Sequence, residues 1–225
     1  MGCERMHAMI LAAGRGTRMG RLTASTPKPL LDLDGESLIE RHLRRLAAAG
    51  IVDIVVNLSY RSEQIRASLG DGARYGVSVR YSREPAEPLE TAGGIVAALP
   101  LLGDAPFLVV NADVVTDFDF AALETESSGT LVLVPNPPHH PAGDYGIDND
   151  SRLTHDEPKY TFAGISLLSP TLFTNLPRGR RPLTDVFDTG IAARTLSAVI
   201  HRGLWIDVGT PERLDLARNA VGVGA

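Results

Sequence analysis

A short apolar run followed by a basic, glycine-containing loop constrains the fold more than any other stretch. Residues 8–13 are continuously apolar and end at a glycine, which predicts a buried strand. In the loop that follows, Gly14 and Gly16 allow the bare backbone to approach a ligand closely. Between residues 14 and 31 the chain carries four basic side chains and no acid, although its net charge is −5. The stretch therefore predicts an anion site, and a polyphosphate is the ligand that fits it.

Two familiar phosphate-binding motifs do not fit this loop. A P-loop requires Gly-Lys-Ser/Thr, whereas the chain has Thr17 and Arg18 after Gly16. A dinucleotide-binding fingerprint requires a third glycine where the chain has Met19, and a helix that starts at once. Two prolines flank Lys28, and they stiffen the backbone and disfavour a helix there. We therefore expect a long ordered loop that holds Lys28 in place at little ordering cost.

Apolar strands alternate with helices through the first half of the chain. Strands are predicted at residues 51–58, 77–81 and 107–110, and helices at 37–49, 62–69 and 91–99. This alternation implies helical crossovers between parallel strands, so we expect an α/β fold, a single Rossmann-like domain with a mostly parallel sheet. Strand candidates at 130–134, 145–148 and 160–168 lie among turn residues and predict a small antiparallel excursion.

The two ends of the chain complete the expected domain. Residues 1–6 are expected to be a disordered extension, and the domain to occupy residues 7–225. Its last part is predicted to hold a helix near 183–194, a strand at 198–200, a turn at 205–209 and a helix from Pro211, capped by Thr210.

The composition excludes several kinds of partner. The net charge of −5 argues against a nucleic-acid-binding protein, which would carry a basic face. No apolar run reaches the roughly 18 residues of a membrane span. The one cysteine, Cys3, cannot form an intramolecular disulfide and suits a reducing compartment. We therefore expect a cytoplasmic protein that binds neither nucleic acid nor membrane.

Three histidines are predicted to be structural. His42 lies on the apolar face of the helix at 37–49, where a packed core histidine is expected rather than a ligand. His139 and His140 lie beside prolines and predict a plain loop rather than a metal site.

An aspartate follows the strand at 107–110. Ligands of open α/β sheets bind beyond the carboxyl ends of the strands, where Asp113 and the basic loop are both expected. Carboxylate oxygens in such a position suit Mg²⁺, which also keeps waters and substrate phosphates. A plain turn or cap aspartate is the structural alternative.

Three segments together resemble the signature of the sugar-1-phosphate nucleotidylyltransferases. They are Leu11 to Met19 (Leu-Ala-Ala-Gly-x-Gly-Thr-Arg-Met), Pro27-Lys28-Pro29, and Trp205 to Pro211 (Trp-Ile-Asp-Val-Gly-Thr-Pro). The resemblance implies the nucleotide-diphospho-sugar transferase fold, with the antiparallel excursion facing the sugar. It also implies nucleotidyl transfer from an NTP to a sugar-1-phosphate, with release of pyrophosphate.

The same resemblance assigns roles to individual residues. Arg18 and Lys28 are the catalytic candidates, and Asp113 and Asp207 are the ligands of one Mg²⁺. The nucleotide-binding candidates are Leu11, Ala12, Ala13, Gly14, Gly16, Thr17, Glu84, Glu90, Thr91 and Gly93. The sugar-binding candidates are Asn111, Gly146, Glu157, Lys159 and Gly164. A helix N-terminus capped by Thr91 explains part of the nucleotide set structurally.

Two positions depart from the family pattern. The usual Glu-Lys-Pro reads Glu157-Pro158-Lys159 here, so the resemblance does not settle whether Lys159 holds the sugar phosphate. Ala112 stands where many relatives have glycine, and we therefore predict an ordinary negative φ at this residue.

Within the family, the chain looks most like the N-acetylmuramic acid-1-phosphate uridylyltransferases of peptidoglycan (cell-wall) recycling. The string Leu-Glu-Thr-Ala-Gly-Gly-Ile from residue 89 and the ending near Asp207 carry that likeness, which implies UTP as donor. A mannose-1-phosphate guanylyltransferase, or another hexose-1-phosphate enzyme, is the alternative. A non-catalytic sugar-nucleotide regulator would be expected to lose Lys28 or an aspartate, and an NAD-dependent oxidoreductase is disfavoured by Met19. The sugar, the strictness of base selection and the oligomeric state stay open.

Overall fold

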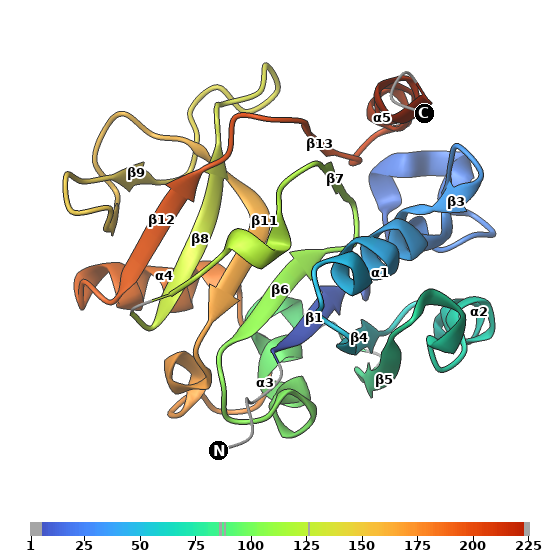
Figure 1. Ribbon diagram of the computed structural model, residues 1–225, viewed down its shortest axis with the longest axis horizontal. Helices are drawn as coiled ribbons and strands as arrows, with labels where there is room; N and C mark the ends of the chain where they lie inside the picture. Colours follow the sequence, from blue (N-terminus) through green and yellow to red (C-terminus); the bar gives the residue numbers. More distant parts are fainter. Residues whose placement is uncertain (1–5, 86, 88, 126, 223–225) are drawn as a thin grey trace.

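A seven-stranded sheet forms the centre of the computed structural model, which describes residues 6–85, 87, 89–125 and 127–222. Its strand order is β12-β8-β11-β6-β1-β4-β5 (Figure 1). The strands are β1 (His7–Leu11), β4 (Asp53–Leu58), β5 (Ser78–Arg83), β6 (Phe107–Asn111), β8 (Gly129–Val134), β11 (Thr161–Leu168) and β12 (Leu196–Ile200). All neighbours pair in parallel except β11, which runs antiparallel to both β6 and β8. The predicted α/β class with a mostly parallel sheet is confirmed.

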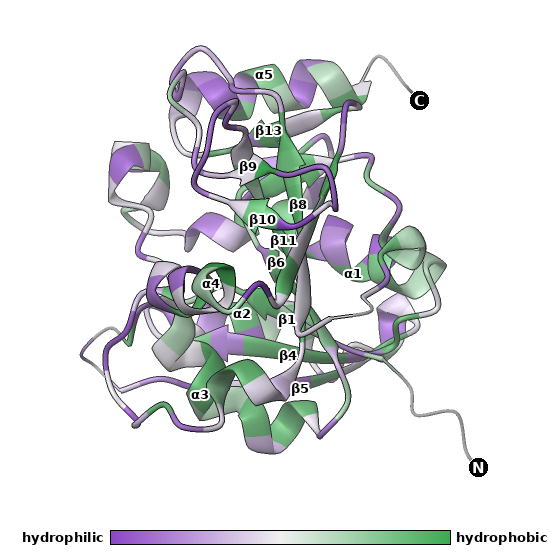
Figure 2. Cartoon of the chain, turned by 90° about the vertical axis from the view of Figure 1, so that its left-hand side faces the viewer, coloured by the Kyte–Doolittle hydropathy of each residue, from purple (hydrophilic) through white to green (hydrophobic). Residues whose placement is uncertain are grey.

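Helices cover both faces of the sheet. They are α1 (Leu38–Ala48), α2 (Ser62–Leu69), α3 (Glu90–Leu102), α4 (Leu183–Ala192) and α5 (Pro211–Gly222). Alternate residues of a strand point to opposite faces, so Ala8 and Ile10 pack with α1 and α2 while Met9 packs with α3 and α4. Figure 2 shows the resulting apolar centre of the sheet. None of the described helices combines the length and apolar character that a membrane crossing needs.

Local signals in α1 act as predicted. Ser37 and Glu40 form a capping box, in which the Ser37 N–H donates to Glu40 Oε2 at 2.8 Å. His42, which lies on the inward face of this helix, is buried in the core, as expected. Burial lowers the His42 pKa to about 4, since a charged imidazole there would lose its hydration. The folded protein therefore holds His42 in the neutral form, and His42 opposes folding progressively as the pH falls from its ordinary pKa toward 4.

Short pieces of structure differ from the sequence-based expectation. The basic loop contains two 3₁₀ turns, η1 (Thr17–Thr23) and η2 (Lys28–Leu30). Four two- or three-residue strands were not predicted: β2 (Asp32–Leu33), β3 (Glu36–Ser37), β7 (Val114–Thr116) and β13 (Trp205–Asp207), the last of which replaces a predicted turn. β2 and β3 pair with each other across the turn at residues 34–35, whereas β7 and β13 pair across a long stretch of chain. Segments of two or three residues are too short to show the period of a strand.

The antiparallel excursion is smaller than the predicted range of residues. Its outer parts, β8 and β11, belong to the main sheet, and only β9 (Gly146–Ile147) and β10 (Leu153–Thr154) form a separate antiparallel pair. Residues 1–5 of the predicted extension lie outside the described residues, whereas Met6 packs against the core. Thr91 does not cap α3, because the helix begins at Glu90 and the N-cap position is occupied by Leu89, which makes no side-chain cap hydrogen bond.

We expect Phe107→Ala to lower the free energy of unfolding by about 3–5 kcal/mol. The substitution leaves a cavity in the buried apolar cluster that α3 and α4 form with one face of the sheet. Phe107 packs 6.1 Å from Phe173 between ring centroids. Leu216→Ala is the control: this side chain is 56% exposed, so its loss should change stability by no more than about 0.5 kcal/mol. Urea unfolding measures both, and equal losses would contradict the packing described here.

Candidate active site

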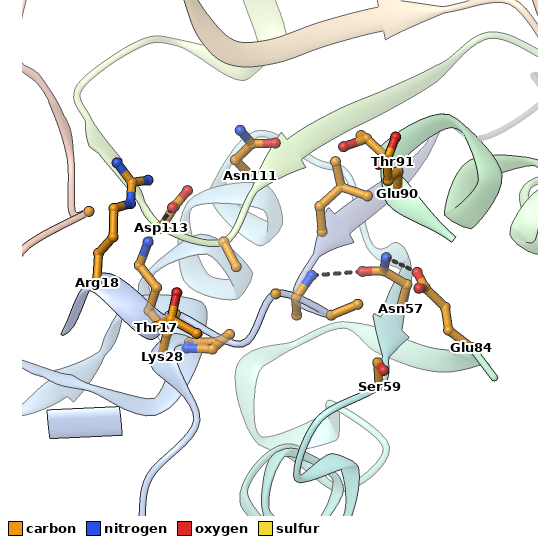
Figure 3. A pocket seen from close by; sticks show the side chains of 18 residues that line it. Thr17, Arg18, Lys28, Asn57, Ser59, Glu84, Glu90, Thr91, Asn111 and Asp113 are labelled. Carbon is orange, nitrogen blue, oxygen red and sulfur yellow. Dashed lines mark hydrogen bonds and ion pairs between the residues drawn. The ribbon is translucent and has the colours of Figure 1, made fainter. Parts of the chain in front are cut away.

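Three loops meet at one edge of the sheet because β4, β1 and β6 are parallel neighbours. The pairing sets Leu11 opposite both Asn57 and Asn111, so the chain leaves all three strands at the same level. A cavity of about 410 Å³ opens there (Figure 3). Its walls include Arg18, Lys28, Asn111 and Asp113. They also include every residue predicted to bind nucleotide except Gly93: Leu11, Ala12, Ala13, Gly14, Gly16, Thr17, Glu84, Glu90 and Thr91.

The basic loop is held by apolar packing beneath it. Met19 is buried in a third core cluster, with Val208 and Leu214, apart from the two clusters on the faces of the sheet. A dinucleotide fingerprint needs glycine at this position. Gly16 has a φ of +63°, and a Cβ there would lie 3.0 Å from the Cβ of Lys28. The glycine therefore serves close packing of the loop on itself, while Met19 anchors the loop to the C-terminal part of the chain.

Lys28 lies at the bottom of the cavity with only 9% of its surface exposed. Its ammonium group donates to Asp113 Oδ2, and the two form an ion pair (Figure 3). Asp113 follows β6 as predicted and keeps part of its side chain open to the cavity. Ala112 does not have a positive φ, which confirms the predicted backbone conformation.

A strand pairing that the sequence does not show brings the backbone of Asp207 beside the segment that follows Asp113. β13 runs antiparallel to β7, which sets Asp207 opposite Val114, and the Val208 N–H donates to the Asp113 carbonyl at 2.8 Å. Both aspartates line a second cavity of about 360 Å³, together with Arg18. The structure therefore places in one cavity the two aspartates that the family resemblance pairs.

Arg213 holds the Asp207 carboxylate in the structure. Its Nη1 lies 2.6 and 2.5 Å from the two carboxylate oxygens, and the Nε2 of His139 lies 3.0 Å from one of them. His140 also lines the second cavity and pairs with Asp144. These histidines lie in a loop, as predicted, and the fold sets that loop beside Asp207, so that both histidines line the second cavity. The described residues include no group of three or more His, Cys, Asp or Glu side chains that could hold a metal ion by itself.

The predicted sugar-binding residues divide into two groups. Asn111 and Gly164 line the second cavity, and a Cβ on Gly164 would lie 2.6 Å from Asn111 Nδ2, so this glycine makes room for the amide. Gly146, Glu157 and Lys159 are not among the residues lining either cavity. A Cβ on Gly146 would lie 2.2 Å from the Asp156 carbonyl oxygen, so that glycine is needed for packing of the excursion. The binding roles of these three residues stay predictions.

Gly93 also lies outside both linings. A Cβ at this position would lie 2.3 Å from the Gly179 carbonyl oxygen, because the segment around Arg181 crosses the first turn of α3. The N–H groups of Ala92 and Gly93 donate to the Arg181 carbonyl at 3.1 and 3.3 Å. The structure thus gives Gly93 a packing role, and its nucleotide contact stays a prediction.

Sequence reasoning missed several residues of the two cavities. They are Pro29, Asn57, Ser59, Ala112 and Gly209 in the first, and Val114, His139, His140, Thr161, Phe162, Ala163, Trp205 and Arg213 in the second. A polar asparagine at the end of the apolar run 51–58 was a signal for Asn57. Arg213 had none, since a basic residue in the first turn of a helix is ordinarily a solvated one.

Comparison with known proteins agrees with this geometry. The sequence model of the nucleotidyl transferase family matches residues 7–221. The chain belongs to the nucleotidyl transferase family. It is 48% identical over 96% of its length to the N-acetylmuramate alpha-1-phosphate uridylyltransferase of Neisseria meningitidis serogroup B, of which it covers 99%.

Two other similarities are informative for the family. The chain is 30% identical over 92% of its length to the mannose-1-phosphate guanyltransferase of Hypocrea jecorina, of which it spans 62%. Its fold superposes with a TM-score of 0.85 on the crystal structure of a putative glucose-1-phosphate thymidylyltransferase from Bacillus anthracis in complex with a sucrose. That similarity covers 96% of this chain and 94% of the other at 22% identity, and it shows the fold. The expected membership of the sugar-1-phosphate nucleotidylyltransferases is confirmed.

We expect Gly16→Ala to destabilise this nucleotidyl transferase more than Gly76→Ala does. Both glycines are left-handed, with φ, ψ of 63°, 34° and 75°, 21°, so each alanine should cost about 1–2 kcal/mol of backbone strain. A Cβ at Gly76 meets nothing within 4 Å, whereas one at Gly16 presses on Lys28 and adds about 1–3 kcal/mol of overpacking. Urea unfolding of both variants measures the difference, and equal losses would contradict the tight contact at Lys28.

Proposed function

We propose that the protein transfers uridylyl from UTP to N-acetylmuramic acid 1-phosphate and releases pyrophosphate. A sugar-phosphate oxygen attacks the α-phosphorus in line. The bond from that phosphorus to the β-phosphate bridging oxygen breaks, and pyrophosphate leaves with the electron pair. The observation that carries the proposal is the convergence of Asp113 and Asp207 beside Lys28 and Arg18, where the two cavities meet. The relative from Neisseria meningitidis, which matches over nearly the whole of both chains, supports the substrates.

The two cavities suggest a division of labour. The first cavity is lined by the basic loop and suits the nucleoside triphosphate. Its phosphates would accept hydrogen bonds from the backbone N–H groups of the loop. The second, lined by Asn111 and Gly164, suits the sugar-1-phosphate. Arg18 lines both and is assigned to the leaving β- and γ-phosphates. Catalysis of this kind depends on positioning and charge stabilisation, because the protein does no covalent chemistry.

Lys28 is assigned to the α-phosphate or the incoming phosphate. Its low exposure keeps its ammonium group at one place, so little reorganisation is needed when negative charge develops in the transition state. In the structure its charge is balanced by Asp113. A phosphate entering the cavity would compete for the same ammonium group.

The residues present suit Mg²⁺. Asp113 and Asp207 supply hard oxygen donors on neighbouring backbone segments, and each is neutralised in the structure by a cation, Lys28 or Arg213. When bound, Mg²⁺ would neutralise phosphate charge between the donor and the acceptor. Asp207 would have to exchange its contact with Arg213 for the ion. Gly93, Gly146, Glu157 and Lys159 stay proposed binding residues, and the role in peptidoglycan recycling stays a prediction.

The similarity to the guanyltransferase of Hypocrea jecorina favours a second candidate, guanylyl transfer to mannose 1-phosphate. Both candidates need the same phosphate and metal chemistry, and they differ only in base and sugar. The identity of 48% against 30% favours the first.

We expect pyrophosphate release to be fastest with UTP and N-acetylmuramic acid 1-phosphate, and to be lost when Mg²⁺ is removed by chelation. The measurement is pyrophosphate release across four NTPs and several sugar-1-phosphates, with and without Mg²⁺. A maximum with GTP and mannose 1-phosphate would select the second candidate. No release from any pair would contradict the proposal.

We expect Lys28→Ala to lower kcat/KM about 10²–10³-fold, as the loss of one preorganised donor does. The variant should fold, because the Asp113 left behind is partly open to water. Arg44→Ala removes a cation that is 62% exposed on α1 and should keep activity within about twofold. Turnover of Lys28→Ala within tenfold of the unaltered enzyme would contradict the role assigned to Lys28.

A further inference from the structure

A buried chain of hydrogen bonds links the basic loop to Glu84. The Ala12 N–H donates to Asn57 Oδ1 at 2.7 Å, and Asn57 Nδ2 donates to Glu84 Oε1 at 2.7 Å (Figure 3). Asn57 is 3% exposed and Glu84 is 8% exposed. These two hydrogen bonds join the residue after β1, the end of β4 and the residue after β5. The three segments form one wall of the first cavity.

The direction of these hydrogen bonds is determined by chemistry. A backbone N–H can only donate, so the asparagine atom facing Ala12 is the amide oxygen, and the amide nitrogen faces Glu84. A carboxylate can only accept, so the second bond fits the same orientation. Asparagine is therefore matched to both neighbours, whereas an aspartate at position 57 would set oxygen against the oxygen of Glu84.

Helix α3 leaves space for this pair. A Cβ on Gly94 would lie 2.6 Å from Glu84 Oε1 and 3.1 Å from Asn57 Nδ2. Glycine inside a helix is less favourable than alanine. Gly94 therefore makes room for the amide and the carboxylate, and any side chain there would displace the carboxylate.

One carboxylate oxygen of Glu84 is left for a ligand. Among the described residues, Asn57 alone donates to this side chain, and it does so to Oε1. Glu84 lines the first cavity on the wall formed by β4 and β5, and Glu90 and Thr91 line the same cavity from α3. Oε2 thus offers an acceptor, and no donor, to whatever occupies this part of the cavity.

We propose that Asn57 is a positioning residue that holds Glu84 to accept a hydrogen bond from the nucleobase, and so selects the base. This inference rests on the proposed function, since it takes the nucleotide to occupy the first cavity. An acceptor suits a base with an N–H at the centre of its pairing edge, which uracil has at N3 and guanine at N1. Cytosine N3 and adenine N1 carry lone pairs instead, and a fixed carboxylate repels them. Asn57 makes the rejection strict because its amide prevents the carboxylate from turning away.

The test compares binding of UTP and CTP to the full-length protein by calorimetry, without sugar phosphate. Sites built around a hydrogen bond reject the wrong partner strongly, and we expect the unaltered protein to favour UTP by about 100-fold or more. Asn57→Asp should reduce that preference to about tenfold or less, chiefly by weakening UTP, because the displaced Glu84 no longer discriminates. Its KM for the sugar phosphate should stay within about twofold, since Asn57 lines only the first cavity.

Two further variants separate positioning from general damage. Asn136→Asp is the matched control: Asn136 also donates through Nδ2, to the Lys159 carbonyl at 3.0 Å, and lies outside the lining of both cavities. It should keep the UTP preference whatever its stability. Glu84→Gln can still accept from Asn57 while presenting a donor to the base, so UTP should weaken and CTP should strengthen even if Asn57→Asp does not fold.

Several outcomes would overturn the inference. One is Asn57→Asp with an unchanged preference, or with equal losses for both nucleotides. Another is Glu84→Gln with the preference of the unaltered protein, and a third is an unaltered protein that favours CTP or ATP. A preference for GTP would support it, with ATP replacing CTP as the comparison. Selective binding of UTP without turnover of any sugar-1-phosphate would defeat the proposed function alone, and the Asn57 comparison would still decide the inference.

Discussion

The pairing of β13 with β7 is the interaction on which the rest of the site depends. It sets Asp207 opposite Val114, and through the Val208 N–H it bonds directly to the Asp113 backbone. Below it, the third core cluster joins Met19 of the basic loop to α5. One small antiparallel pair therefore ties together the first loop of the chain, the segment after β6 that carries Asp113, and β13, which carries Asp207. Hydrophobic burial beneath the polar site keeps this arrangement closed.

Charge balance at the site follows from the same pairing. Two carboxylates meet where the chain also supplies Lys28 and Arg213, and each carboxylate has a cation of its own. Unpaired, two nearby carboxylates would repel each other and disfavour the fold. The paired arrangement holds both carboxylates in position, and under the proposed function phosphates and a divalent ion would exchange partners with groups already in place. Such preorganisation is what phosphoryl chemistry asks of a protein.

The wall of the first cavity uses a different device, which is backbone clearance. Gly94 gives room to the Asn57–Glu84 pair, and Gly16 gives room to the turn over Lys28. In each case the absent Cβ allows a polar group or a backbone segment to come closer than any side chain would permit. In this cavity the donors and acceptors are aligned only where the backbone makes space for them.

Sequence alone determined what depends on short-range physics. The alternation of apolar strands and helices, the Ser37–Glu40 capping box and the buried His42 each follow from neighbours a few residues apart, and the motifs around Gly16, Lys28 and Asp207 indicated the chemistry. The tertiary structure decided the pairing of Asp207 with the segment after Asp113, the capture of Asp207 by Arg213, the approach of His139 and the link from Asn57 to Glu84. Except for the Asp207–Arg213 contact, which joins residues of β13 and α5 that are six apart, these depend on contacts between segments far apart in the chain. A two-residue or three-residue strand carries no periodic signal, and the direction of a single side chain is set by whatever the fold places beside it.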